Sequence, residues 1–225
     1  SAELSDVALN PEFPENWITG CLGGSPGSEW VECTDFPDII FTEFNVNSFD
    51  GHDAGDWVEI YNRGDITADL TGWIFHDRNE DNIFRFPKNA VLNPGEYKVI
   101  ARDPVMFDLI YPEMSVFSPF DFGLGDDDSL VLLNRYQNEI CGIGYHKDSL
   151  WPDDIYGTGR TAELISTDSV VSDPASWKNG CYGGTPGMPQ SFCNDNPELL
   201  ITEIQYHPHD EYNGGTYFEL FNNDT

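Results

Sequence analysis

Residues 23–27 read Gly-Gly-Ser-Pro-Gly and fit the G-x-S-x-G pattern of serine hydrolases. In those enzymes the backbone N–H of the residue after the serine helps to bind the oxyanion. Here that residue is Pro26, which has no N–H. Residues 183–187 repeat the segment, with Thr185 in place of Ser25. The segment is therefore predicted to be a turn, and no catalytic residue is assigned anywhere in the chain.

Three aspartates that could bind calcium gather in one segment of the chain: Asp50, Asp53 and Asp56. Calcium takes about six to eight oxygen ligands, and loops with spaced aspartates can supply them. The spacing does not match the D-x-[DN]-x-[DN]-G calcium loop, and Asn213 and Thr216 replace the last two aspartates 160 positions later. Calcium is the one cofactor that the sequence suggests, and a solvated acidic loop is the alternative.

Cysteine spacing predicts two disulfides. Cys21 and Cys33 are twelve residues apart, as are Cys181 and Cys193, and each pair flanks a Gly-Pro segment with no core of its own. A Cys21–Cys33 and a Cys181–Cys193 bond would each contribute about 2–3 kcal/mol by loop closure. The alternative joins Cys141 to Cys181. Either pairing predicts an oxidising, extracytoplasmic location, secreted or at the cell surface.

The charge balance excludes two classes of partner. The 225 residues include 40 acidic and 10 basic ones, so the formal net charge is -30, and all ten cations lie between Arg63 and Lys178. Such a surface repels phosphate backbones and anionic lipid, which argues against binding to nucleic acid. No apolar run approaches the roughly 18 residues of a membrane span, so membrane insertion is not expected either. The chain has no initiator methionine or signal peptide, so Ser1 is expected to lie within a longer chain.

The chain repeats itself after 160 residues. Residues 1–65 align with residues 161–225 without a gap, and 20 of the 65 pairs are identical. The repeated elements include Ala-Glu-Leu at residues 2–4 and 162–164, Thr-Glu at residues 42–43 and 202–203, and both cysteine pairs. We therefore expect the tail of one repeat at 1–33, a complete repeat at 34–193 and the opening strands of a third at 194–225, arranged as separate beads.

Within the complete repeat, residues 38–146 are predicted to form a sandwich core and residues 147–193 a loop-rich tail. Asp103 and Pro104 predict the start of one helix that ends before Pro112. The tail is expected to contain one short strand near residues 162–165. Alternation and turn residues predict strands at 38–45, 56–62, 70–76, 83–86, 97–101, 129–133 and 139–145. This pattern predicts an all-β, immunoglobulin-like β-sandwich with one short helix.

Three segments carry a family resemblance. Residues 55–65 read Gly-Asp-Trp-Val-Glu-Ile-Tyr-Asn-Arg-Gly-Asp, residues 69–74 read Asp-Leu-Thr-Gly-Trp-Ile, and residues 92–97 read Leu-Asn-Pro-Gly-Glu-Tyr. With these, residues 38–146 resemble the lamin tail domain in its bacterial extracellular form. The resemblance implies an immunoglobulin-like sandwich without catalytic residues. Trp73 is expected to fill the core, and Glu59 to bond to a neighbouring loop or project outward.

These observations lead us to expect a non-catalytic structural or adhesive repeat of a secreted or cell-surface bacterial protein. It would space or present other domains, and its partners would be neighbouring repeats or domains, or a surface protein or glycan. Two alternatives stay open: an accessory binding module of a secreted nuclease or hydrolase, and a calcium-dependent carbohydrate-binding module. The last would need aromatic rings such as Trp57 and Trp151 to be exposed for stacking on sugars.

Overall fold

The structure is a computed structural model that describes residues 2–19, 27, 37–49, 51–112, 114–147, 149–189, 193, 199–206, 208 and 215–222. In chain order its elements are β1 (Ala2–Leu4), η1 (Pro14–Asn16), β2 (Trp17–Thr19), β3 (Ile39–Asn45), β4 (Trp57–Asn62), β5 (Ala68–Asp69), β6 (Ile74–His76), β7 (Ile83–Arg85), β8 (Val91–Leu92), β9 (Tyr97–Ala101), α1 (Pro104–Ile110), β10 (Val116–Phe117), β11 (Asp127–Leu133), β12 (Glu139–His146), β13 (Arg160–Leu164), η2 (Pro174–Ser176), β14 (Trp177–Tyr182), β15 (Leu199–Gln205) and β16 (Tyr217–Asn222).

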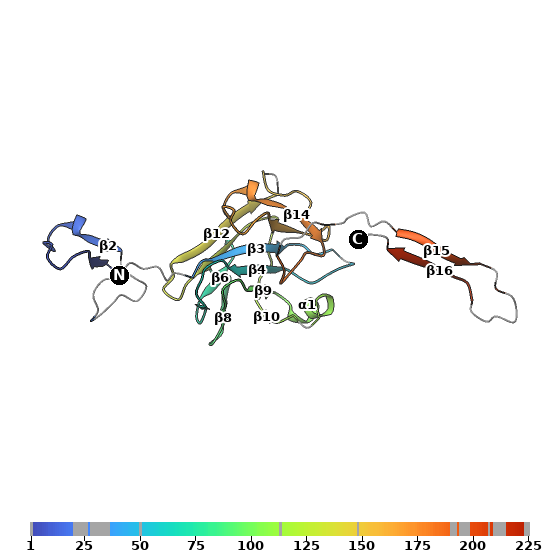
Figure 1. The fold of residues 1–225 in the computed structure, drawn as a ribbon, viewed down its shortest axis with the longest axis horizontal. Coiled ribbons are helices and arrows are strands. Elements are labelled where there is room, and N and C mark those ends of the chain that lie inside the picture. Colours follow the sequence, from blue (N-terminus) through green and yellow to red (C-terminus); the bar gives the residue numbers. More distant parts are fainter. Residues whose placement is uncertain are drawn as a thin grey trace.

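A six-stranded sheet forms one layer of the central domain, in the order β10-β9-β4-β3-β13-β14. Figure 1 shows β9, β4 and β3 side by side at the centre of the molecule. All its pairs are antiparallel except β9 with β10. The pairing of β3 with β4 shifts by one residue between Phe41 and Glu43, a β-bulge that leaves Thr42 without a Cα partner.

A four-stranded sheet in the order β12-β11-β6-β7 forms the second layer, and β5 pairs with β8 apart from both sheets. Strands β11 and β12 form a hairpin, and the register shifts once, between Leu132 and Leu133. The turn between β8 and β9 follows from Asn93-Pro94-Gly95, where Gly95 adopts a φ of 72° that favours glycine.

The main core lies between the two layers and is rich in aromatic rings. Phe44 on β3 packs against Tyr145 on β12, with ring centroids 4.8 Å apart, and against Trp177 on β14 at 5.4 Å. Trp73 is buried, as the sequence predicts. The alternating pattern of β3 and β4 thus puts one apolar face into this core.

A second, smaller cluster covers the outer face of the six-stranded sheet. Asp103 caps helix α1 by accepting hydrogen bonds from Val105 N and Met106 N, which confirms the predicted helix start. The helix places Phe107 against Trp57 of β4, with ring centroids 6.0 Å apart. Trp57 therefore belongs to the face of the sheet that is turned away from the main core.

The tail contributes more to the sheet than the sequence predicts. One short strand is expected in residues 147–193, but the structure has two, β13 and β14. Strand β13 pairs with β3 through Ala162 opposite Phe44 and Glu163 opposite Glu43. Because β13 and β14 complete the six-stranded sheet, the sandwich extends beyond the predicted core of residues 38–146.

Two further hairpins, β1–β2 and β15–β16, form two-stranded sheets of their own, and among the described residues their strands pair with none of the central ones. In β15–β16 the apolar side chains stay exposed: Ile204 and Phe218 are 61% and 65% exposed. Their counterparts 160 positions earlier, Phe44 and Val58, are fully buried. Among the described helices, none has both the length and the apolar character needed to cross a membrane.

Candidate functional site

Three glutamates meet on the outer face of the six-stranded sheet, each from a different strand. Glu43 of β3 stands opposite Glu59 of β4 and opposite Glu163 of β13 in the strand register. All three side chains are buried, with exposed fractions of 1%, 1% and 2%. Buried carboxyl groups are rare unless they are paired or hydrogen-bonded, so this cluster calls for partners.

Residues 183–187 of the tail, Gly-Gly-Thr-Pro-Gly, supply many of those partners. The Thr185 N–H donates to both carboxylate oxygens of Glu43, at 3.0 and 3.1 Å. The Gly187 N–H donates to Glu59 Oε2 at 2.5 Å. Glu59 therefore bonds to a neighbouring loop, one of the two outcomes expected from the sequence. We call this segment and the three glutamates the tail latch.

Side chains complete the polar contacts of the latch. The Thr161 hydroxyl donates to Glu43 Oε1 at 2.5 Å, and the Thr42 hydroxyl donates to Glu59 Oε1 at 2.6 Å. Thr42 can do this because the β-bulge frees it from the strand register. Lys178 on β14 forms a 3.0 Å ion pair with Glu163 Oε2. The donors come from both sheet strands and tail, so the latch ties the two together.

The fit of the tail segment requires glycine. At Gly184 the φ is 75°, and an added Cβ would lie 2.8 Å from Glu43 Oε1, 2.8 Å from Thr161 Cγ2 and 3.1 Å from Trp57 Cζ2. The Tyr111 hydroxyl donates to the carbonyl of Gly183. The segment is a turn, as the sequence predicts, and its backbone lies directly on the glutamates.

Burial changes the acidity of two of these carboxyl groups. Burial raises the pKa of Glu43 to about 8; the charge of Glu59 adds to the rise, and the hydrogen bonds from Thr161 and Thr185 counter it. Burial likewise raises the pKa of Glu59 to about 7, against the hydrogen bonds from Thr42 and Gly187. Near neutral pH the cluster therefore holds protons that an exposed glutamate would release.

Carboxyl groups with raised pKa values occur in active sites as well as in structural networks. A general acid must reach its substrate, however, and here Glu43 and Glu59 are covered by the tail segment that they bind. What this arrangement can do chemically is hold a backbone segment by charge-assisted or neutral hydrogen bonds, depending on pH.

A disulfide fixes the chain just after the latch. Cys181 and Cys193 are bonded, with Cα atoms 5.0 Å apart, as the sequence predicts. Cys141 is a buried free cysteine, so the alternative pairing of Cys141 with Cys181 is wrong. The predicted Cys21–Cys33 bond lies outside the described residues.

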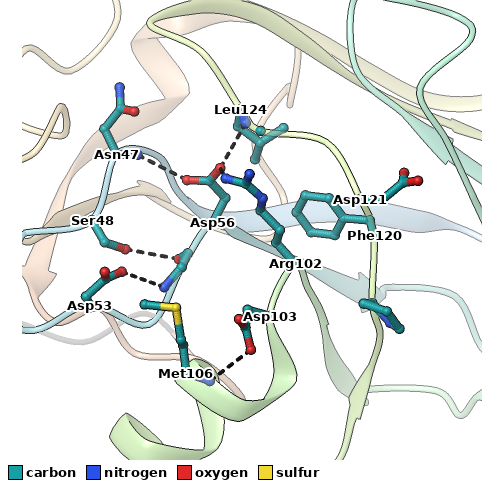
Figure 2. A pocket seen from close by; sticks show the side chains of 13 residues that line it. Asn47, Ser48, Asp53, Asp56, Arg102, Asp103, Met106, Phe120, Asp121 and Leu124 are labelled. Atoms are coloured by element: carbon teal, nitrogen blue, oxygen red, sulfur yellow. Dashed lines mark hydrogen bonds and ion pairs between the residues drawn. The ribbon is translucent and has the colours of Figure 1, made fainter.

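The calcium candidates lie near a cavity of about 690 Å³ that Figure 2 shows. Asp53 Oδ1 accepts a hydrogen bond from Gly55 N at 3.0 Å. Asp56 is buried, and its carboxylate accepts from Asn47 N, Leu124 N and Arg102 at 3.0–3.2 Å. The two aspartates thus serve the loop itself.

Asp50 lies outside the described residues, so the calcium site stays a prediction. Within the part of the chain that is described, no group of three or more His, Cys, Asp or Glu side chains could hold a metal ion. Trp57 and Trp151 are buried, so the sequence-based idea that these two rings stack on a sugar is wrong. Both rings face partners inside the protein, Phe107 and Phe44, because the sandwich needs them for packing.

Two packed antiparallel layers with one short helix define an immunoglobulin-like β-sandwich, as the sequence predicts. Residues 34–147 match the family model of the Lamin Tail Domain, which is half of the chain, so the chain belongs to the lamin tail domain family. This family is an immunoglobulin-like, typically non-catalytic domain. A search of curated protein sequences found no significant match.

Proposed function

We propose that the chain is a non-catalytic structural unit of a tandem array in a secreted or cell-surface bacterial protein, where it spaces or presents neighbouring domains. In this proposal residues 34–193 are one complete repeat, residues 1–33 end the preceding one and residues 194–225 begin the next. Its partners are then the neighbouring repeats of the same protein.

One observation carries the proposal: strand pairing recurs at an offset of 160 residues. Strands β15 and β16 pair in the same register as β3 and β4, with the bulge between Ile201 and Glu203 in place of that between Phe41 and Glu43. Strands β1 and β2 pair in the register of β13 and β14. A sequence repeat that also repeats its hydrogen-bonding register supports repeated domains rather than chance similarity.

The tail latch supports a spacing role. A spacer must set where the chain leaves one domain and enters the next, and here the tail is held on the sheet by buried carboxyl groups and closed by Cys181–Cys193. Both constraints lie immediately before the segment that leads to β15. The disulfide also supports an extracytoplasmic location, because reducing compartments keep such thiols open.

The test uses the protein in the cells that make it. We expect a membrane-impermeant label to reach the chain on intact cells, and alkylation before lysis to find Cys181 and Cys193 already oxidised. Peptide mapping of the natural protein should find further copies of the 160-residue repeat. A chain found in the cytosol with both thiols alkylated would contradict the location. A catalytic domain directly beside residues 1–225, without further copies, would contradict the spacer role and favour an accessory module of an enzyme.

A further inference from the structure

The unpaired edges of β1 and β15 are complementary. In the central domain the hairpin β3–β4 and the hairpin β13–β14 join through β3 and β13, with Ala162 opposite Phe44 and Glu163 opposite Glu43. Strands β15–β16 repeat the first hairpin, and β1–β2 repeat the second. Each therefore lacks the neighbour that its counterpart has.

We propose that β1–β2 of one copy of the chain docks on β15–β16 of a second copy, by the same edge pairing as β13 on β3. The register assigned is Ala2 opposite Ile204 and Glu3 opposite Glu203. This inference deepens the proposed function, because it names the partner of the exposed strands. The occupant is a second copy because β1–β2 carries the same residue types as the hairpin that binds β3: Ala-Glu-Leu at residues 2–4, as at 162–164.

Details of β15–β16 match the site that β13 occupies. The Thr202 hydroxyl already donates to Glu219 Oε1, as the Thr42 hydroxyl donates to Glu59. Docking would bring Glu3 to Glu203 and Glu219, which is the set of three glutamates seen in the tail latch. The Gly-Gly-Ser-Pro-Gly at residues 23–27 follows β2 as Gly-Gly-Thr-Pro-Gly follows β14.

The exposed surface is large enough to support association. Six apolar side chains of β15–β16 are 52–65% exposed, where five of their six counterparts in β3–β4 are buried at 0–1% and the sixth, Tyr61, partly: Leu199, Ile201, Ile204, Phe218, Leu220 and Phe221. At roughly 100 Å² each they offer on the order of 600 Å², near the ~800 Å² per partner of a standard interface. Edge-strand addition supplies backbone hydrogen bonds as well.

The test mixes two full-length variants that each carry one new cysteine. One pair is Ala2→Cys with Ile204→Cys, and the other is Glu3→Cys with Glu203→Cys. Adjacent antiparallel positions alternate between hydrogen-bonded and non-hydrogen-bonded pairs, so one of the two suits a disulfide better. Because each chain has a single new cysteine, a bond between the two introduced cysteines reports contact between different copies.

Under mild oxidation we expect at least one pair to form the mapped heterodimer at least five-fold more than the control, Val7→Cys with Ile204→Cys. Val7 is 90% exposed and lies outside β1, so it measures chance collision. Heterodimer at the control level for both pairs would overturn the inference. That failure would leave the proposed function standing, because the surface location and repeat number of the natural protein are measured separately.

Discussion

Replacing Glu43 with glutamine should make the stability of the domain less sensitive to pH. Glutamine keeps the size of the side chain and one acceptor oxygen for the Thr161 and Thr185 donors, and it cannot ionise. The folded protein holds the Glu43 carboxyl proton up to a pKa of about 8, whereas the unfolded chain releases it near 4.5. Since the unfolded state then binds fewer protons, the free energy of unfolding falls as pH rises between these two values.

The size of the effect follows from the two pKa values. Each pH unit inside the window costs about 1.36 kcal/mol per group, so raising the pH from 5 to 8 should remove about 3–4 kcal/mol through Glu43. Glu59, with its pKa raised to about 7, adds about 2–3 kcal/mol over the same range. Against a typical total of about 5–15 kcal/mol, the loss is large.

The assay is urea unfolding of the full chain at pH 5 and pH 8, followed by tryptophan fluorescence. We expect Glu43→Gln to match the original chain within about 1 kcal/mol at pH 5 and to exceed its stability by about 3 kcal/mol at pH 8. Glu80→Gln is the matched control, because Glu80 is exposed and its substitution should leave the pH dependence unchanged. If Glu43→Gln lowers stability equally at both pH values, the latch binds an ionised Glu43 and the reasoning is refuted.

Three further outcomes can be checked on the same chain. Gly184→Ala places a methyl group 2.8 Å from the Glu43 carboxylate and should cost about 2–4 kcal/mol, whereas Gly72→Ala, at a similar φ with open space, should cost about 1 kcal/mol; urea unfolding compares them. Cys193→Ser should cost about 2–3 kcal/mol and speed protease cleavage in the tail, and an unchanged cleavage rate would argue against a fixed tail. Limited proteolysis should trim the chain to about residues 34–195 and leave the main thermal transition nearly unchanged; collapse of the central domain on trimming would mean that the repeats share cores.

Strands with a clear pattern could be predicted from the sequence. The predicted strand at residues 97–101 matches β9, and the predictions at 38–45 and 56–62 differ from β3 and β4 by one residue at the start. Alternation was readable there because one face of each strand is apolar. Strand β14, Trp-Lys-Asn-Gly-Cys-Tyr, was missed because it lacks alternation and contains Gly180. Its position depends on β13, a tertiary contact that local pattern does not carry.

The tail latch was only partly visible in the sequence. Glu59 stood out because it interrupts an apolar strand, and its bond to a loop was one stated outcome. Glu43 and Glu163 resemble ordinary surface charges, since burial of a carboxyl group depends on partners distant in sequence. One signal pointed to them: glutamate recurs at all three positions 160 residues apart, as Glu3, Glu203 and Glu219, while many neighbours differ.

The joining of β3 to β13 has a consequence for synthesis on the ribosome. The hydrogen bond between Thr161 and Glu43 spans 118 residues, which take roughly 6–24 s to translate at about 5–20 residues per second. A β-hairpin forms in about 1–10 μs, so β3–β4 can pair early and then wait with an open edge. A β13-like strand from a neighbouring repeat could capture that edge first. The net charge of -30 acts against such misassembly, because nascent chains of this composition repel one another.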